Sequence, residues 1–306
     1  MQRRSFLKNS LLSSAALTTG ATSVLATGDS GPAPARNFKL KYAPHLGMFA
    51  QSAGDDPVDQ LKFMAEMGFK AFEDNDMRNR EVALQEKMAK AMASLGIQMG
   101  VFVAHKIYWD KPNLASGNED LRKEFLDDIR KSVEVAKRVN ARWMTVVPGH
   151  LDLRLNLGYQ TAHVMESLRQ AAGILEPHGL VMVLEPLNFR DHPGLFLTSC
   201  PQSYAICKAV GSPACKTLFD IYHEQISEGN LLPNIEAAWD EIAYFQIGDN
   251  PGRNEPTSGE INYKNIFKYI HSRGYNGILG MEHGNSQKGK DGEMAVIKAY
   301  EEVDGF

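Results

Sequence analysis

The chain has 306 residues, with 43% hydrophobic and 23% charged residues, which are ordinary values for a globular protein. This length suits one large α/β domain or two smaller ones. The formal net charge of −4 lacks the strongly basic balance typical of nucleic-acid-binding proteins. The composition therefore favours a small-molecule enzyme or a neutral interaction domain, and we expect no nucleic-acid partner.

The first 26 residues have the pattern of an export signal. Arg3-Arg4-Ser5-Phe6-Leu7-Lys8 is a twin-arginine motif, and a mildly apolar stretch from Leu11 to Ala26 follows it. That stretch is too short and too rich in small residues for a durable membrane anchor. We expect residues 1–26 to be a twin-arginine signal peptide, the twin-arginine export machinery to be a partner, and the mature protein to be periplasmic or otherwise exported. A disordered basic tail is the alternative. Residues 27–37 are predicted to be a flexible lead-in.

Strand-like and helix-like segments alternate through residues 38–306. The predicted strands are Lys39–Phe49, Ala71–Asp74, Gln98–Ala104, Arg142–Val147, Val181–Leu187, Thr217–Ile221, Ala243–Ile247 and Gly277–Glu282. The predicted helices are Pro57–Met67, Glu81–Leu95, Leu121–Val139, Gln160–Glu176, Gln202–Val210, Leu232–Trp239, Tyr263–Arg273 and Gly292–Val303, and C-terminal caps are expected at Gly68, Gly96, Gly179 and Gly274.

Eight strand–helix pairs predict an α/β fold, a closed (β/α)₈ TIM barrel formed by residues 38–306. A doubly wound open sheet fits less well, because no glycine-rich phosphate turn follows the first strand. Three loops after strands are long enough to shape a pocket: Lys106–Glu119, Phe189–Pro201 and Gly248–Asn262. Tyr108 and Trp109, in the first loop, either form a wall over a sugar-like ligand or pack at the barrel rim.

Four polar residues close four successive apolar runs: Glu185, Asp220, Gln246 and Glu282. The C-terminal ends of barrel strands converge on one mouth, where catalytic residues lie. Three carboxylates and an amide in one mouth would repel each other without a cation. Such an oxygen-rich set suits Mg²⁺ or Mn²⁺ better than a structural zinc ion. The pattern therefore predicts a divalent metal cofactor held by these four residues.

Two further residues are candidates for binding a substrate. His223 lies three positions after Asp220, and Arg253 lies in the loop after Gln246. Both side chains can hold hydroxyl or carboxylate oxygens of a small molecule, and the other reading is a hydrogen-bond network at the rim. Cys200, Cys207 and Cys215 form no CxxC pair, and we interpret them as small buried hydrophobic residues, with one disulfide left open.

The segments LEPLN, FDIYHEQISEGNL, FQIGDNPGRNEPTSGEINY and GILGMEHG resemble the hydroxypyruvate isomerase family of the xylose-isomerase-like barrels. The resemblance runs from about Lys39 to Val303. It implies that a metal is held by Glu185, Asp220, Gln246 and Glu282, that Glu185 and Glu282 also move the proton, and that His223 and Arg253 bind substrate oxygens.

The chain departs from the family at Asn254, where the family has His, and at Thr257-Ser258, where it has Gly-Thr. The first change removes a titratable group from the mouth, which weakens the expectation of a carboxylate-bearing substrate such as hydroxypyruvate. The leading hypothesis is a metal-dependent isomerase or epimerase of a small hydroxy-carbonyl compound or sugar, working through an enediolate. The alternatives are an exported, non-catalytic sugar-binding protein and a phosphodiesterase like the apurinic-site endonucleases. The sequence leaves a homo-oligomer open.

Overall fold

A computed structural model describes residues 36–306, which contain eight strands and ten α-helices. The strands are β1 (Lys41–Ala43), β2 (Ala71–Phe72), β3 (Gln98–Met99), β4 (Trp143–Val146), β5 (Val181–Leu184), β6 (Cys215–Asp220), β7 (Ile242–Gln246) and β8 (Ile278–Gly280). The helices are α1 (Ala50–Ala53), α2 (Pro57–Glu66), α3 (Val82–Leu95), α4 (Glu119–Val139), α5 (Leu157–Leu175), α6 (Cys200–Val210), α7 (Ile221–Ser227), α8 (Leu231–Ala238), α9 (Tyr263–Ser272) and α10 (Gly289–Val303). Short 3₁₀ turns cover Met77–Asn79, Leu114–Ser116 and Glu176–His178.

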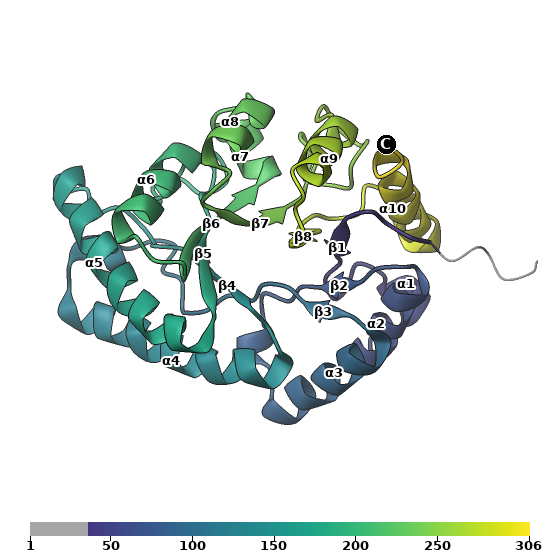
Figure 1. Ribbon diagram of the computed structural model, residues 1–306, viewed down its shortest axis with the longest axis horizontal. Coiled ribbons are helices and arrows are strands. Elements are labelled where there is room, and N and C mark those ends of the chain that lie inside the picture. The colour runs from purple at the N-terminus through teal and green to yellow at the C-terminus, as the bar shows by residue number, and fades with distance from the viewer. Residues whose placement is uncertain (1–35) are drawn as a thin grey trace, which may run out of the picture. The chain divides into compact units, whose positions relative to one another are not determined.

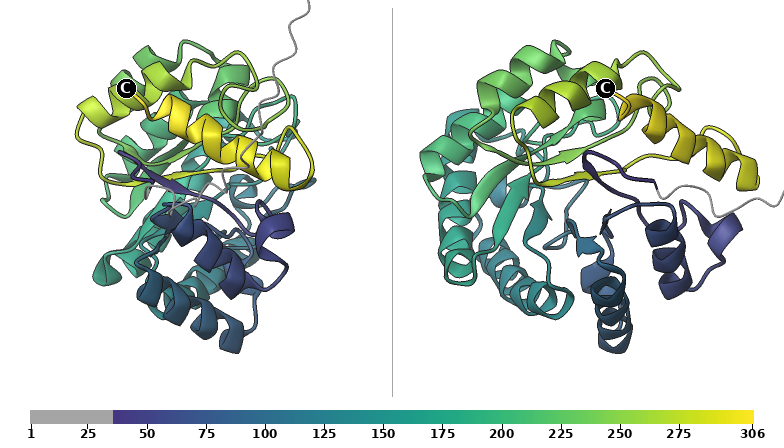
Figure 2. Two further views of the ribbon diagram at one scale, coloured as in Figure 1. Left: turned by 90° about the vertical axis from the view of Figure 1, so that its right-hand side faces the viewer. Right: turned by 45° about the vertical axis from the view of Figure 1, so that its right-hand side comes forward.

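All of these strands pair in parallel, in two groups. One sheet has the order β1-β8-β7-β6-β5-β4, and β2 pairs with β3 separately. Two backbone hydrogen bonds join these groups into a ring. Glu73 N, after β2, donates to Pro44 O, after β1, at 3.1 Å, and Ala104 N, after β3, donates to Thr145 O of β4 at 3.0 Å. The helices lie outside the strands in Figure 1 and in the right-hand view of Figure 2. The predicted (β/α)₈ barrel is confirmed.

Two apolar cores stabilise the barrel. Inside the ring, small and branched residues of β1, β2, β5, β6 and β8 surround two aromatic rings, Trp143 and Tyr244, whose centroids are 5.9 Å apart. A much larger core fills the layer between the strands and the outer helices. Helix α10 lies beside α1 and α9, so the last β/α unit contacts the first. With both faces of the parallel sheet covered, most strand residues are apolar and buried.

Six of the strands are shorter than the sequence predicts, whereas β6 is one residue longer and β7 has the predicted length. The run Lys39–Phe49 contains only the three residues of β1, followed by turns that lead into α1. Helix α7 was not predicted, and Ile221, assigned to a strand, is its first residue. The reason is local: the Asp220 carboxylate accepts hydrogen bonds from the backbone N–H groups of Tyr222 and His223 and starts a helix directly after β6.

Other local predictions are confirmed. Gly68, Gly96, Gly179 and Gly274 all have positive φ, as expected for residues that end a helix or its terminal turn. The three cysteines are buried and unpaired. No helix in the described residues is long and apolar enough to span a membrane.

The predicted signal peptide, residues 1–26, and most of the predicted lead-in lie outside the described residues. The residues just before β1 contact the rest of the barrel. Arg36 forms an ion pair with Glu301 of α10, and Phe38 stacks on Phe69 with ring centroids 5.2 Å apart.

Candidate active site at the C-terminal mouth of the barrel

The four predicted metal ligands all lie at the C-terminal ends of their strands. Asp220 and Gln246 are the last residues of β6 and β7 and face each other in register. Glu185 follows β5 directly, and Glu282 lies two residues beyond β8. Glu185, Asp220 and Gln246 are buried, whereas the Glu282 side chain keeps 26% of its surface exposed. The strands thus bring this set to one mouth, as in other β/α barrels.

Asp220 uses its two carboxylate oxygens differently. Oδ1 accepts the backbone N–H groups of Tyr222 and His223 at 2.8 and 3.4 Å, which fixes the start of α7. Oδ2 faces the mouth, where it accepts a hydrogen bond from Arg253 Nη2 at 2.9 Å. One side chain therefore both caps the helix that carries His223 and presents an oxygen to the site.

The hydrogen bonds of His223 determine which ring nitrogen carries its proton. Nδ1 lies 3.2 Å from the backbone N–H of Asn188, so Nδ1 is an acceptor. In a neutral imidazole the proton must then sit on Nε2. Burial lowers the pKa of His223 to about 4, so the ring is neutral near pH 7. Nε2 has no hydrogen-bond partner among the described residues and faces Glu185 and Asp220, with oxygens at 3.9 and 3.6 Å.

Neutral His223 is thus arranged as a donor, and its free N–H suits an oxygen atom of a ligand. Glu185, Asp220 and His223 each offer an atom within 4.8 Å of the others, a spacing compatible with metal binding. A protonated Nε2 cannot coordinate a cation, however. The geometry therefore favours His223 as a hydrogen-bond donor over His223 as a metal ligand.

Arg253 is held by a tightly bonded loop between β7 and α9. Its backbone has φ +49° and donates N–H to Asp249 O at 2.8 Å. The buried Asp249 carboxylate accepts the N–H groups of Gly259 and Ile261, which closes the loop on itself. The guanidinium lies over the ring of Tyr222 and is 2.9 Å from Asp220 and 3.5 Å from Glu282. The backbone hydrogen bonds within the GRNEPTSGEIN segment therefore fix the position of the Arg253 guanidinium at the mouth.

The mouth contains more negative charge than Arg253 neutralises. Burial raises the pKa of Glu185 well above its usual range, and the neighbouring Glu282 and Asp220 raise it further. Burial also raises the pKa of Glu282, while Arg253 opposes this. Glu282 Oε2 and Gln246 Oε1 are buried atoms without a hydrogen-bond partner in the described part of the chain. Unpartnered buried oxygens beside crowded carboxylates fit the chemistry of a hard divalent cation.

The structure adds two site residues that the sequence did not reveal, both from the segment after β2. Glu73 is buried and approaches Gln246 and Tyr244 inside the barrel. Asn75 Nδ2 donates a hydrogen bond to Glu282 Oε1 at 2.9 Å. The only signal in the sequence was that Glu73-Asp74-Asn75 follows the short apolar run Ala71–Phe72.

Further contacts link the mouth to the loops above it. Asn188 Nδ2 donates to both Nδ1 of His223, at 2.7 Å, and Asp191, at 2.9 Å. His192 lies between His223 and Trp109, with ring centroids 5.5 and 5.4 Å apart. Trp109 is half exposed and extends this row of rings outward, whereas the Tyr108 hydroxyl bonds to Glu124 on α4. For these two aromatic residues the sequence left open a wall over a ligand or packing at the rim, and only Trp109 lines the cavity beside the mouth.

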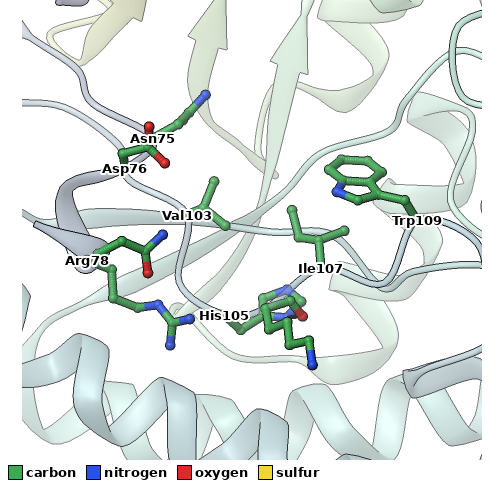
Figure 3. A pocket seen from close by; sticks show the side chains of 9 residues that line it. Asn75, Asp76, Arg78, Val103, His105, Ile107 and Trp109 are labelled. Carbon is green, nitrogen blue, oxygen red and sulfur yellow. Dashed lines mark hydrogen bonds between the residues drawn. The ribbon is translucent and has the colours of Figure 1, made fainter.

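A cavity of ≈350 Å³ adjoins these residues and is lined by Asn75, Asp76, Arg78, Asn79, Val103, His105, Lys106, Ile107 and Trp109. In Figure 3, Asn75 and Trp109 lie on opposite sides of this cavity, with Val103 between them. Since Asn75 also bonds to Glu282, the cavity is next to the candidate active site.

The sequence matches the family described as "Xylose isomerase-like TIM barrel" over residues 61–301. The 2-oxo-tetronate isomerase of Cupriavidus necator is 30% identical over 277 residues, which cover 88% of this chain and 98% of that protein. Hydroxypyruvate isomerase of Escherichia coli is 34% identical over 160 residues, 52% of this chain and 62% of that protein, so this match spans less than two thirds of the relative.

A solved structure titled AP endonuclease, family 2, from Brucella melitensis superposes with a TM-score of 0.73 at 26% identity, covering 83% of this chain and 96% of that one. The fold and the two curated relatives agree with the resemblance found in the strand-end segments. The chain therefore belongs to the hydroxypyruvate and 2-oxo-tetronate isomerase family of the xylose isomerase-like TIM barrels, which confirms the predicted enzyme class, an isomerase.

Proposed function

We propose that the protein is a divalent-metal-dependent isomerase or epimerase of a small hydroxy-carbonyl compound or sugar. The observation that carries this proposal is the set of buried Glu185, Asp220 and Gln246 with partly exposed Glu282, in which two oxygens are unpartnered within the described residues. Mg²⁺ or Mn²⁺ held by these residues would supply the positive charge that stabilises negative charge developing on adjacent substrate oxygens.

In this proposal each protein group has a distinct task. Glu185 and Glu282 come from β5 and β8 and are the bases that remove a proton from carbon and return it at the neighbouring atom or the opposite face. The Nε2–H of His223 donates to a substrate oxygen. Arg253 holds a second oxygen and balances part of the carboxylate charge. Asn75 donates a hydrogen bond to Oε1 of Glu282, and Oε2 of Glu282 has no hydrogen-bond partner in the described residues.

The cavity beside Asn75 supports a substrate that extends away from the reacting carbons. The curated relatives are named for hydroxypyruvate and for 2-oxo-tetronate, and the second matches along nearly its whole length. Asn254 stands where the family has histidine, so the chain lacks one group that could carry positive charge and bind a substrate carboxylate. The cavity and the second relative favour a compound of four or more carbons over hydroxypyruvate, and Asn254 places a ketose ahead of a sugar acid.

Metal binding is the first test. Calorimetry with Mn²⁺ should give one site per chain, and Glu185→Ala or Asp220→Ala should abolish that binding, because each removes a carboxylate ligand. Glu236→Ala, on an exposed position of α8, is the matched control and should bind normally. Undiminished binding in both site variants would place the cation elsewhere.

Proton exchange is the second test, and it separates an enzyme from a binding protein. NMR in D₂O with hydroxypyruvate, 2-oxo-tetronate, ketoses and aldoses should reveal deuterium on a carbon of at least one compound. Ligands that bind without exchange would favour the non-catalytic sugar-binding protein. A DNA oligonucleotide with an abasic site is included because the similar Brucella protein is named an AP endonuclease, and cleavage of this DNA would favour a phosphodiesterase.

Export is proposed on the sequence alone. Replacing Arg3 and Arg4 by Lys should retain the protein in the cytoplasm with an uncleaved N-terminus, because twin-arginine signals are read through the arginine pair. Fractionation followed by N-terminal sequencing measures both effects. Normal export of the Lys-Lys variant would contradict a twin-arginine route.

A further inference from the structure

Glu73 is a buried carboxyl group that none of the roles proposed above uses. It follows β2, and its side chain crosses the interior of the barrel toward β7, which is not a neighbour of β2 in the ring. Its exposed fraction is 2%. Oε2 accepts the hydroxyl of Tyr244 at 3.0 Å, and Oε1 lies 3.5 Å from Nε2 of Gln246. Tyr244 and Gln246 are alternate residues of β7, so both side chains point into the barrel.

The direction of the Tyr244 hydroxyl bond is fixed by its other partner. The backbone N–H of Val101 points at the Tyr244 oxygen at 3.4 Å. The hydroxyl oxygen accepts there, and its hydrogen is free to bond to Glu73. Glu73 therefore receives one donor on each oxygen, Tyr244 on one and Gln246 on the other.

Two glycines make room for this arrangement. A Cβ atom at Gly280 would overlap the Glu73 carboxylate, and one at Gly100 would overlap the Tyr244 hydroxyl. Gly280 pairs in register with Gln246 on the neighbouring strand. The absence of a side chain at position 280 is what lets the Glu73 carboxylate come alongside Gln246.

A primary amide has a donor edge and an acceptor edge, and its partners decide which way each points. Nε2 of Gln246 faces Glu73, while Oε1 is buried and has no partner within residues 36–306. If the amide turned over, its oxygen would meet a carboxylate oxygen, and its nitrogen would face the cation site. An amide nitrogen with two hydrogens cannot coordinate a cation, so the turned amide would remove one ligand.

We propose that Glu73 is a positioning residue that holds the Gln246 amide with its oxygen, and not its nitrogen, toward the cation site. The inference rests on the proposed function, because it assumes a cation there. Groups of this kind, which orient a metal ligand from behind, typically contribute 10–100-fold to metal affinity.

The test separates position from charge by measuring Mn²⁺ affinity calorimetrically on the purified full chain. Glu73→Leu removes both acceptor oxygens and should weaken binding about 10–100-fold. Glu73→Gln keeps an oxygen for the Gln246 amide but removes the charge, and its affinity should stay within about threefold of wild type. Glu73→Asp keeps the charge but shortens the reach, and it should weaken binding about as much as Glu73→Leu. Glu73→Asp also replaces Glu73→Leu if that variant does not fold, as judged by circular dichroism.

A double-mutant cycle completes the test. In the Gln246→Ala background there is no amide to orient, so Glu73→Leu should then change Mn²⁺ affinity by less than about threefold. An equal loss in both backgrounds, or a loss in Glu73→Gln as large as in Glu73→Leu, would show that Glu73 acts through its charge and overturn the inference. Absence of Mn²⁺ binding in wild type would instead contradict the proposed function, and the inference with it.

Discussion

The two groups of strands in the barrel differ in length and in what they contribute to the site. The six-stranded sheet includes β6, with six residues, and supplies Glu185, Asp220, Gln246 and Glu282. Strands β2 and β3 have two residues each, yet the segment after β2 supplies Glu73 and Asn75, which contact Gln246 and Glu282. The longer strands carry the proposed chemistry, and the shorter pair holds two of its side chains in place. Experiments on each part can test this division.

The largest effect is expected at the six-stranded side. Glu282→Gln keeps an oxygen for a cation but cannot accept a proton from carbon. Turnover should fall by about 10²–10⁴, the usual cost of losing a general base. Steady-state kinetics and deuterium incorporation measure the loss, and the exposed Glu236→Gln is the control. Wild-type turnover in Glu282→Gln would exclude Glu282 as a base.

The joint between β3 and β4 should be sensitive to acid. His105 Nε2 accepts the backbone N–H of Val147 at 3.3 Å, and burial lowers the pKa of His105 to about 4. An unfolded histidine binds a proton below about pH 6.5, but folded His105 does not until about pH 4. His105 therefore costs stability as the pH falls through this window, by about 3 kcal/mol in total.

His105→Gln removes that proton-binding difference. Chemical unfolding at several pH values should show a smaller loss of unfolding free energy between about pH 6.5 and 4 than in wild type. The exposed His178→Gln is the matched control. Identical pH profiles for His105→Gln and wild type would mean that His105 does not stay neutral in the folded protein.

At the mouth, His223→Asn separates substrate binding from metal binding. Asn can still accept the Asn188 N–H but has no group in place of the free Nε2–H. We expect kcat/KM to fall about 10–100-fold, the value of one lost hydrogen bond in a buried site, while Mn²⁺ affinity stays within about threefold. A large loss of Mn²⁺ affinity would instead make His223 a metal ligand.

The smallest effect is expected for Asn75→Leu, on the side of the short strands. It removes the hydrogen bond to Glu282 Oε1 without changing charge, and kcat should fall about tenfold because Glu282 loses its fixed orientation. Asn79→Leu changes the lining of the same cavity and is the control. Equal losses in the two variants would indicate an effect of the cavity surface and not of Glu282.

Local sequence patterns were sufficient to predict the alternation of strands and helices, the barrel, and the four residues at the ends of β5 to β8. Each of those strands ends in a short apolar run that stops at a polar residue, and parallel strands in one ring bring their ends together. The same reasoning identified His223 and Arg253 as neighbours of the set, with the help of the family resemblance. It missed helix α7, because a single side chain, Asp220, starts that helix.

Only the tertiary structure revealed Glu73, Asn75 and the tautomer of His223. Glu73 and Gln246 are 173 residues apart and meet across the barrel interior, and Asn75 and Glu282 are 207 apart. No local pattern encodes such contacts, since β2 has only two residues and the room for Glu73 is made by Gly280 on another strand. The His223 proton is likewise located by a backbone N–H from a different β/α unit. Residues at strand ends can be predicted from local sequence, whereas the side chains that orient them come from distant strands and are brought into contact only when the barrel closes.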